Sequence, residues 1–462
     1  MEKVFTWIDE HKDEMIEDLG TLVGINSVEA APKDDAPFGE GARDALLKFL
    51  EIGKRDGFRI DNLQNYAGDI EFGQGEETVG IIAHVDVVPA GSGWDTDPFK
   101  MENDGVYLTG RGTQDDKGPA IAAYYAMRAI KELNLPIKRG IRLILGTNEE
   151  TNWGGINYYV KNKKMPDMGF TPDAEFPVIF GEKGISTGTL SLKLDLSNSA
   201  VIEFKAGNAP NMVPDYAEII LDASKINKDA LNNMINDCTF EELGDKVKVS
   251  SVGKSAHGST PQIGINAISN LLAGLKDVIK ADDEFAKFVK FYNNKMAFKY
   301  YGEDMGVGFS DEISGKLNFN IGMIEKFADR VDVVINMRFP LTGVTNEDIK
   351  VGLEGASKEF NGVYTQTGGE NPLYIDPESK LVKIFMEAYR NQTNDNESKP
   401  MVIGGGTYAK AMDNCVAFGA LFKEDEDRMH QKNERIKIDS LVASAKIYAE
   451  ALLTIATEEK VL

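Results

Sequence analysis

Cysteine is scarce in this sequence, which limits the covalent and redox chemistry that it can support. Of its 462 residues only Cys238 and Cys415 are cysteines, and they lie far apart in the chain. They form neither a CxxC pair nor the spaced set of a disulfide framework. A disulfide-stapled secreted fold is therefore excluded as an interpretation.

Basic charge and long apolar runs are also in short supply. The chain has 51 lysines and arginines against 74 acidic residues, a net charge of −23. Such a chain repels phosphate backbones and anionic lipid surfaces, so we expect neither nucleic acid nor a membrane as a partner. No stretch of 18 apolar residues predicts a membrane span, and acidic residues interrupt the first 25 residues too often for a signal peptide. We expect a cytoplasmic protein, with an amphipathic helix at residues 4–23.

The pattern of apolar segments predicts two kinds of domain. Between about 40 and 180, expected helices at 42–57, 118–134 and 152–164 alternate with strands. These are a buried strand with the loop after it at 78–89 and a strand at 141–147. This order is typical of an α/β domain with a mostly parallel central sheet flanked by helices. From 185 the strands become longer and alternating, which favours an inserted α+β domain with an antiparallel sheet. We therefore expect an α/β domain in two parts, 1–184 and 376–462, interrupted by an insertion at 185–375.

Histidines are few enough to be weighed one at a time. His11 lies in a charged helical segment and is expected to have no special role. His84 follows a buried strand and precedes Asp86 by two residues, so both side chains can point to the same side of an extended segment. Parallel sheets collect their chemistry at the carboxyl ends of their strands, where His84 and the pair Glu149–Glu150 fall.

Each acidic candidate also has an ordinary structural interpretation. Asp115 and Asp116 in GRGTQDDKGP could cap the helix that begins near Pro119, and Glu149 and Glu150 could do the same for the helix expected from 152, with Asn152 as its cap. Asp173 could sit in a proline-framed turn, and His430 in a solvated run of charges.

Taken together, these residues suit a different purpose. His84, Asp115, Glu150, Asp173 and His430 supply two imidazoles and three carboxylates. That set is sufficient for two divalent ions about 3.5–4 Å apart that share a bridging carboxylate. The remaining glutamate of the pair could act as a base toward a bridging water.

Six motifs connect the chain to a known family. HVDVVPAGSGWDTDPF, GRGTQDDKGP, GTNEETNWGG, PDAEFP, SAHGSTPQIGINA and MHQKNE occur in that order and closely resemble the co-catalytic zinc metallopeptidases of the aminoacylase and carboxypeptidase-G group. Within that group the chain looks most like the bacterial peptidase V dipeptidases, which are relatives of carnosinase. The resemblance covers essentially the whole chain.

The resemblance implies a role for each candidate in the α/β domain. His84, Asp115 and Asp173 would hold one metal ion, and Asp115, Glu150 and His430 the other. Asp86 would orient the ring of His84, and Glu149 would be the general base. Asp115 is chosen over Asp116 because it fits the family pattern GRG-x-x-D, after which the family often has a cis peptide bond. Zn²⁺ is the expected ion, although Mn²⁺ or Co²⁺ also suits this oxygen-rich set.

Within the insertion, which the resemblance makes a lid, four positions are implied in substrate binding. His257 would stabilise the oxyanion of the tetrahedral intermediate. Asn211 and Arg338 are candidates for the substrate's terminal carboxylate, and Gly405 and Gly406 could line it with backbone amides. Because the insertion is large enough for a doubled lid, the resemblance implies that His257 acts in cis and that the protein is an active monomer.

Three functions remain open from the sequence. A dipeptidase that acts on short peptides with a free N-terminus is the leading hypothesis. An N-acyl amino acid amidohydrolase of the aminoacylase or desuccinylase type is the second. A non-catalytic binding protein on the same scaffold is the third, and the complete set of expected ligands argues against it.

Overall fold

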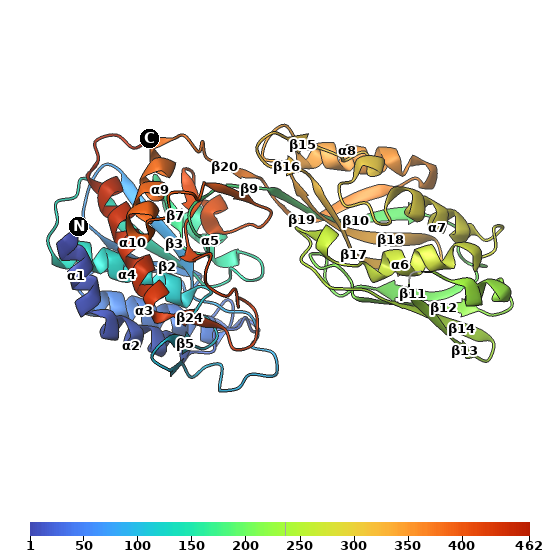
Figure 1. Ribbon diagram of the computed structural model, residues 1–462, viewed down its shortest axis with the longest axis horizontal. Coiled ribbons are helices and arrows are strands. Elements are labelled where there is room, and N and C mark those ends of the chain that lie inside the picture. The colour runs from blue at the N-terminus through green and yellow to red at the C-terminus, as the bar shows by residue number, and fades with distance from the viewer. Residues whose placement is uncertain (236) are drawn as a thin grey trace. The chain divides into compact units, whose positions relative to one another are not determined.

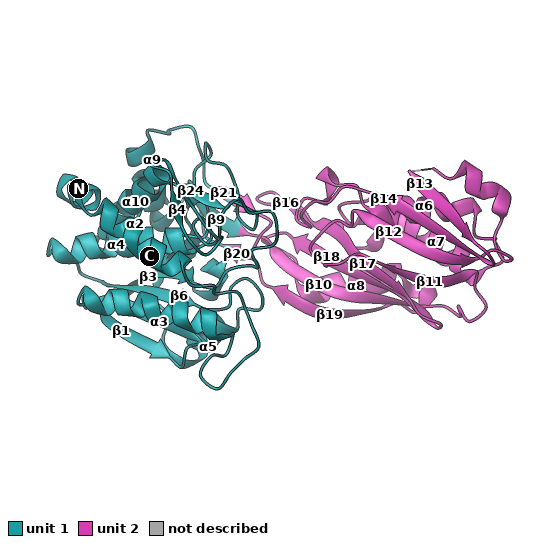
Figure 2. Ribbon diagram, turned by 90° about the horizontal axis from the view of Figure 1, so that it is seen from below, with its two compact units in different colours: residues 1–181, 374–401, 407–462 teal, residues 182–373, 402–406 magenta. Residues whose placement is uncertain are grey.

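A computed structural model describes every residue of the chain except Asn236. The chain divides into two compact units, coloured separately in Figure 2. Unit 1 comprises residues 1–181, 374–401 and 407–462, and unit 2 comprises residues 182–373 and 402–406. The chain passes between the units within strands β9, β20 and β21 and again after residue 406.

Unit 1 is built on a mixed sheet whose centre is parallel. The strand order is β1-β2-β6-β3-β7-β22-β9-β20, with β21 paired to β9. The neighbours β6–β3, β3–β7 and β7–β22 are parallel, whereas β1–β2, β2–β6 and β22–β9 are antiparallel. The strands are β1 Arg59–Leu63, β2 Ala67–Phe72, β3 Thr78–His84, β6 Gly140–Gly146, β7 Met168–Thr171, β9 Ile179–Glu182, β20 Leu373–Tyr374, β21 Met401–Ile403 and β22 Cys415–Ala417.

Two small sheets complete the strands of this part of the chain. One is three-stranded, in the order β24-β5-β4, and β23 pairs with β8. Their bounds are β4 Glu102–Asn103, β5 Tyr107–Thr109, β8 Ala174–Glu175, β23 Ala420–Leu421 and β24 Arg435–Lys437.

Helices pack against the large sheet and against one another, as Figure 1 shows for α4 and α10. They are α1 Glu2–Glu10, α2 Lys12–Val23, α3 Glu40–Arg55, α4 Lys117–Glu132, α5 Gly154–Asn162, α9 Lys380–Thr393, α10 Ile438–Thr457 and the short 3-10 helix η6 Tyr408–Ala411. Among the described residues, α10 alone has the length and apolar composition of a membrane span, but 67% of that window is buried in the protein. Its apolar surface is thus part of the core.

The expected elements agree with the structure within narrow limits. The helices expected at 42–57, 118–134 and 152–164 are α3, α4 and α5, and their ends differ by at most two residues. The single helix expected at the N-terminus is instead two helices that meet at His11. The ring of His11 stacks on Trp7 with centroids 3.8 Å apart, and its Nδ1 lies 2.7 Å from the Trp7 carbonyl oxygen.

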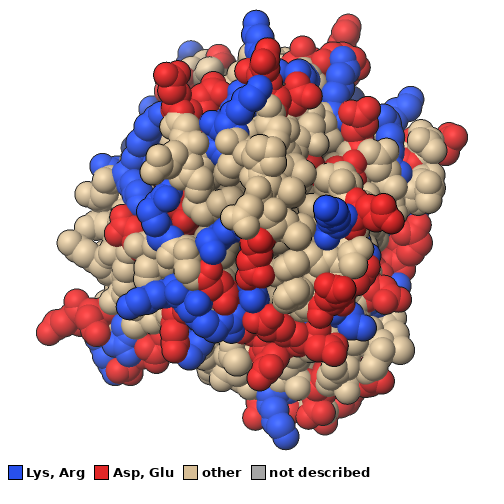
Figure 3. All heavy atoms as spheres, turned by 90° about the vertical axis from the view of Figure 1, so that its left-hand side faces the viewer, with Lys and Arg blue, Asp and Glu red and all other residues tan. Residues whose placement is uncertain are grey.

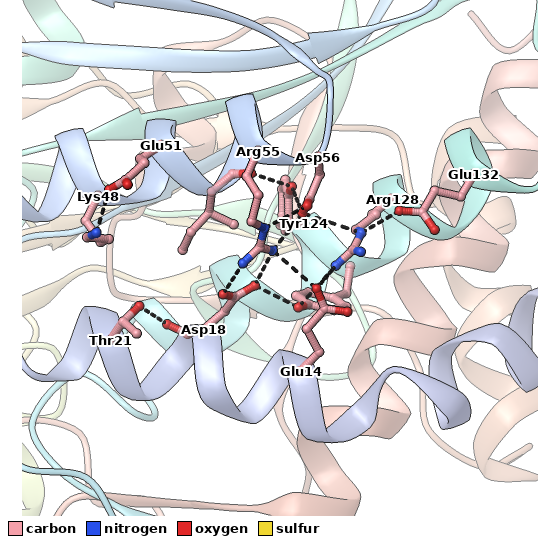
Figure 4. A network of polar contacts seen from close by, with 12 residues as sticks. Glu14, Asp18, Thr21, Lys48, Glu51, Arg55, Asp56, Tyr124, Arg128 and Glu132 are labelled. Atoms are coloured by element: carbon pink, nitrogen blue, oxygen red, sulfur yellow. Dashed lines mark hydrogen bonds and ion pairs between the residues drawn. The ribbon is translucent and has the colours of Figure 1, made fainter.

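Ion pairs and hydrogen bonds join α2, α3 and α4 into a cluster that we call the helix network, shown in Figure 4. Its members are Glu14, Asp18, Arg55, Asp56, Tyr124, Arg128 and Glu132. Arg55 donates to both carboxylate oxygens of Asp18 at 2.8 Å, and the Tyr124 hydroxyl donates to Asp56 at 2.6 Å. The network fixes α4, and α4 follows directly on the loop that carries Asp115.

Unit 2 contains an antiparallel eight-stranded sheet in the order β13-β14-β12-β11-β17-β18-β10-β19. Every pair in it is antiparallel. The strands are β10 Gly184–Lys193, β11 Val201–Ala206, β12 Tyr216–Asp222, β13 Cys238–Leu243, β14 Lys246–Val252, β17 Asn318–Lys326, β18 Arg330–Phe339 and β19 Val363–Glu370. A separate hairpin pairs β15 Ser310–Asp311 with β16 Gly315–Lys316.

The helices of unit 2 share one apolar core with this sheet. They are α6 Ala267–Gly274, α7 Glu284–Lys295 and α8 Asn346–Ala356, with the 3-10 helices η1 Lys228–Asn233, η2 Pro261–Ile263, η3 Leu275–Asp277, η4 Glu303–Met305 and η5 Lys358–Phe360. Strict alternation of burial along β10 places every second side chain in that core. The expected fold class, a parallel-centred α/β domain with an inserted antiparallel α+β domain, is confirmed.

The borders of the two units differ slightly from the expected ones at 184/185 and 375/376. The larger difference concerns residues 402–406, expected in the α/β domain but grouped with unit 2. The backbone N–H of Lys183 donates to the Ile403 carbonyl at 2.9 Å, and Gly404 lies against Ser259 so closely that a Cβ on it would be 2.9 Å from the serine Cβ. Gly405 and Gly406 therefore belong with the insertion.

The face drawn in Figure 3 carries acidic and basic side chains interspersed among uncharged ones. The excess of 23 negative charges is thus not gathered into one continuous acidic area on that face.

Candidate metal centre

The candidate ligands of unit 1 come from the carboxyl ends of neighbouring parallel strands. His84 is the last residue of β3, Glu149 and Glu150 follow β6, and Asp173 follows β7. These three strands are adjacent in the sheet, so their ends share one edge. Asp115 precedes α4, and the loop between β23 and β24 supplies His430.

Asp115 lies between the two histidines. Its Oδ1 is 3.1 Å from Nε2 of His84, and its Oδ2 is 2.9 Å from Nε2 of His430. His84 Nε2 is also 3.6 Å from Oδ2 of Asp173, and His430 Nε2 is 3.1 Å from Oε2 of Glu150. Each oxygen of Asp115 thus faces a different histidine–carboxylate pair, which is the arrangement of a bridging carboxylate.

Two overlapping groups of potential ligand atoms lie within 4.8 Å of one another: His84 with Asp115 and Glu150, and His84 with Glu149 and Asp173. The five residues predicted as ligands are therefore in one place, and we call them the metal-ligand cluster. Glu149, predicted as the base, lies at its edge.

Burial and mutual repulsion shift the acid–base equilibria of the cluster. Burial, reinforced by the charge of Asp115, raises the pKa of Glu150 to about 7 and also raises the pKa of Asp173. Burial alone would lower the pKa of His84, but hydrogen bonds to Asp115, Asp173 and Asp86 outweigh it and leave that pKa well above the usual value. Hydrogen bonds to Asp115 and Glu150 raise the pKa of His430 to about 11. The site favours positive charge next to its carboxylates.

The donor set fits divalent metal ions. Imidazole nitrogens and carboxylate oxygens are the ligands that Zn²⁺ takes in catalytic sites, and Mn²⁺ accepts the same oxygens. Oε1 of Glu150 is buried and has no hydrogen-bond partner, so a cation would satisfy it. An excess of buried carboxylates over cationic side chains points the same way.

Asp86 contacts the ring of His84 and also holds the backbone of the two glutamates. In line with its predicted role toward the ring of His84, Nδ1 of that ring lies 3.0 Å from the Asp86 backbone oxygen and 3.5 Å from the Asp86 carboxylate. The carboxylate accepts the backbone N–H groups of Glu149, at 3.0 Å, and Glu150, at 3.1 Å. Asp86 thereby sets the position of both glutamates.

The four adjacent acidic residues, Asp115, Asp116, Glu149 and Glu150, do not cap helices with their side chains. α5 begins at Gly154, four residues beyond Glu150, and its N-cap is Trp153 rather than the expected Asn152. Asp116 is the N-cap residue of α4 but makes no side-chain cap bond. Its Oδ2 instead accepts the backbone N–H of His84 at 3.1 Å, and the Asp115–Asp116 peptide bond is cis, as the resemblance implies.

Sequence reasoning missed Glu434, which shapes the Asp115 loop. Its fully buried Oε1 accepts the backbone N–H groups of Gly112, Gln114 and Asp115 at 2.8–3.1 Å, while Arg111 donates to Oε2 at 2.6 Å. The one hint in the sequence was that Glu434 lies four residues after His430, within the motif MHQKNE.

The predicted residues of the insertion gather within unit 2. The backbone N–H of Gly258, next to His257, donates to the Asn211 carbonyl at 2.7 Å. A Cβ on Gly258 would lie 3.1 Å from Oδ1 of Asn336, the oxygen that accepts Nε–H of Arg338 at 3.2 Å. Gly404 and Gly405 form a bend that Gly406 follows, and Gly404 lies against Ser259.

The fold and the cluster define a metallohydrolase, and comparison with known proteins names its family. The sequence profile of Peptidase family M20/M25/M40 matches residues 80–454, and the chain belongs to this family. It is a metallopeptidase whose relatives are named as dipeptidases.

Two curated relatives and two solved structures illustrate the likeness. A protein of Staphylococcus aureus (strain bovine RF122 / ET3-1) named "Putative dipeptidase" is 39% identical over 478 residues, covering 98% of this chain and 99% of its own. One from Staphylococcus epidermidis with the same name is 39% identical over 468 residues, covering 97% and 98%. Human carnosine dipeptidase 1 has a TM-score of 0.59 at 20% identity and covers 98% of both chains. Aminoacylhistidine dipeptidase from Vibrio alginolyticus has a TM-score of 0.59 at 17% identity, covering 96% and 97%.

Proposed function

We propose that this metallopeptidase is a dipeptidase that hydrolyses the peptide bond of short peptides with a free N-terminus. The observation that carries the proposal is the position of Asp115 between His84 and His430, with Glu149 at the edge of the cluster. The names of the curated relatives support the substrate class.

Two divalent ions, most simply Zn²⁺, would be held by the metal-ligand cluster. His84, Asp115 and Asp173 would hold one, and Asp115, Glu150 and His430 the other. When bound, such ions lower the pKa of a water molecule and polarise the scissile carbonyl.

Glu149 serves as the general base in this proposal. Its backbone is fixed by Asp86, and burial keeps the pKa of its carboxyl group well above the usual value. A raised pKa makes a carboxylate a stronger base, so it accepts a proton from water more readily and can pass it on to the leaving amine. Glu150 has a different task, because its Oε2 faces His430.

His257 is proposed to donate a hydrogen bond to the developing oxyanion, in cis. The backbone N–H of Ser259 donates to Nδ1 of His257 at 3.3 Å, and the Ser259 hydroxyl lies 2.7 Å from the same nitrogen. Because Nδ1 accepts, the proton of the neutral ring resides on Nε2, which makes Nε2 a donor.

Arg338 is proposed to bind the terminal carboxylate of the substrate, with Asn211 and the amides of Gly405 and Gly406 as further contacts. Its side chain is 5% exposed, and its Nε–H donates to Oδ1 of Asn336 at 3.2 Å. Burial lowers its pKa to about 10. A buried guanidinium gains most from a ligand that offers a planar pair of oxygens.

The deciding experiment measures hydrolysis by metal-reconstituted protein of a dipeptide, its N-acetyl form and its C-terminal amide. We expect rapid cleavage of the free dipeptide only. Preference for the N-acetyl form would establish the amidohydrolase alternative, and no chelator-sensitive hydrolysis of any of them would leave a binding protein.

The carboxylate contact has its own control. Arg338→Ala should lower kcat/KM for the free dipeptide by about 10- to 1,000-fold, the scale of a lost charge-assisted contact, but change little for the amide. Equal losses on both substrates would contradict the assignment.

The role of His257 in cis is tested by sedimentation combined with activity measurements, which should find an active monomer. Activity confined to a dimer would overturn that role.

A further inference from the structure

Trp153 makes a contact that distinguishes the two adjacent glutamates. Its indole Nε1–H donates to Oε1 of Glu149 at 3.1 Å. Among the described residues this is the one hydrogen bond to the Glu149 carboxylate, and Glu150 receives none from the indole. Oε2 of Glu149 has no hydrogen-bond partner in the described part of the chain.

The backbone around Trp153 is held in an unfavourable conformation that points the indole back at Glu149. Its φ of 56° and ψ of 22° lie in the left-handed region, where a bulky residue is uncommon. Asn148, which is fully buried, pins this turn: its carbonyl accepts the Trp153 N–H at 2.9 Å, and its side chain accepts the Gly154 N–H at 3.0 Å. Such an unfavourable backbone conformation persists only where surrounding contacts enforce it, and it is found most often at functional sites.

A second ring supports the indole. Tyr408 packs edge-on against Trp153, with centroids 5.3 Å apart, and edge-on against His84, at 6.2 Å. It fits because residue 146 is a glycine: a Cβ there would lie 2.5 Å from the Tyr408 hydroxyl oxygen. The indole of Trp153 thus packs between the turn that carries the two glutamates and the ring of Tyr408, which also contacts His84.

We propose that Trp153 is a positioning residue for Glu149, an inference that rests on the proposed dipeptidase function. By engaging Oε1, the indole fixes the carboxylate so that Oε2 alone is available for the water proton. It also keeps Glu149 from serving as a metal ligand, although its oxygen lies within 4.8 Å of the ligand atoms of His84 and Asp173. The division of labour between Glu149 and Glu150 is then imposed by one N–H group.

The first test replaces Trp153 with 3-benzothienylalanine, which keeps the shape of the ring system but lacks the N–H. We expect kcat to fall about 10- to 100-fold, the scale of a lost hydrogen bond to a charged group, with KM unchanged. Metal content measured by mass spectrometry should remain that of the parent. Trp153→Phe should show the same loss, and the same benzothienyl replacement at Trp7, in α1, should leave kcat unchanged.

The second test does not use activity. Protein labelled with ¹⁵N-tryptophan gives three indole N–H signals, which Trp7→Phe and Trp94→Phe assign by elimination. Glu149→Gln should move the Trp153 signal upfield, because the indole loses a charged acceptor, and Glu150→Gln should leave it in place.

The inference is overturned if the benzothienyl protein keeps the parent kcat, if its metal content falls together with kcat, or if the Trp153 signal ignores Glu149→Gln. Should the parent fail to hydrolyse dipeptides, the proposed function fails by itself. The indole signal then still decides whether Trp153 holds Glu149.

Discussion

The helix network and the metal-ligand cluster both gather several carboxylates within unit 1, but the carboxylates have different partners. In the helix network every carboxylate meets an arginine: Asp18 and Asp56 contact Arg55, and Glu14 and Glu132 contact Arg128. In the metal-ligand cluster the three carboxylates face histidines instead of arginines, and one oxygen of Glu150 has no partner.

The pKa values of Asp56 and Glu150 shift in opposite directions. Burial raises the pKa of Asp56, but hydrogen bonds from Arg55 and Tyr124 and the charge of Arg128 outweigh it, so the pKa ends below its usual value. For Glu150, burial raises the pKa to about 7, and the charge of Asp115 adds to this effect. In the helix network every carboxylate contacts a guanidinium, whereas in the metal-ligand cluster Oε1 of Glu150 is left for a cation to satisfy.

Chelation should have the largest effect, and only on the metal-ligand cluster. Removing the ions should abolish hydrolysis and lower the melting temperature, because ions bound only to the native state stabilise it by about 2.7 kcal/mol when present at a hundredfold excess over Kd. Activity assays and calorimetry with and without chelator, followed by Zn²⁺ addition, measure both. Hydrolysis that survives complete chelation would contradict the metal assignment.

Glu149→Gln should have the next largest effect. We expect kcat to fall about 100- to 10,000-fold through loss of the general base, with metal content unchanged. Because the substitution removes a buried carboxylate that repels its neighbours, the free energy of unfolding should not decrease. Glu150→Ala is the matched control and should lose one ion. Equal loss of metal from both variants would show that the two glutamates share one task.

Asp56→Asn should give the opposite result from Glu149→Gln. We expect the free energy of unfolding to fall by about 1–3 kcal/mol at pH 7, because Tyr124 and the arginines lose a charged partner, while kcat and metal content stay the same. The folded pKa of Asp56 is depressed, so its contribution is present above about pH 4 and is lost as the pH falls through the folded pKa. Urea unfolding at pH 7 and pH 3.5 should therefore show a smaller difference between variant and parent at the lower pH. A constant difference would contradict this account.

Glu51→Gln should have the smallest effect. Glu51 pairs with Lys48 on the exposed face of α3, next to the helix network (Figure 4), and solvent screens that pair. We expect no measurable change in the urea midpoint or in kcat. A loss comparable to that of Asp56→Asn would mean that burial is not what separates the two pairs.

Much of the fold could be predicted because it depends on local periodicity. The apolar run of β3 and the helical spacing of α3 and α4 indicated an α/β domain, and the alternating strands after 185 indicated the antiparallel insertion. The break at His11 was missed, because the apolar positions of α1 and α2 also fit one continuous helix.

The site was predictable in its members but not in its internal contacts. Residue types and motif order indicated His84, Asp115, Glu150, Asp173 and His430. The tasks of Asp86, Glu434 and Trp153 depend on which backbone amide or carboxylate lies within hydrogen-bonding distance, and no spacing rule contains that distance.

The amino-acid sequence by itself determined the composition of the metal-ligand cluster and the class of chemistry it supports, because ligand preference is a property of side-chain atoms. Only the tertiary structure decided that Asp115 faces both histidines and that Glu149 and Glu150 point to different partners. Neighbours in sequence share a backbone, but their side chains follow whatever the fold places opposite each of them.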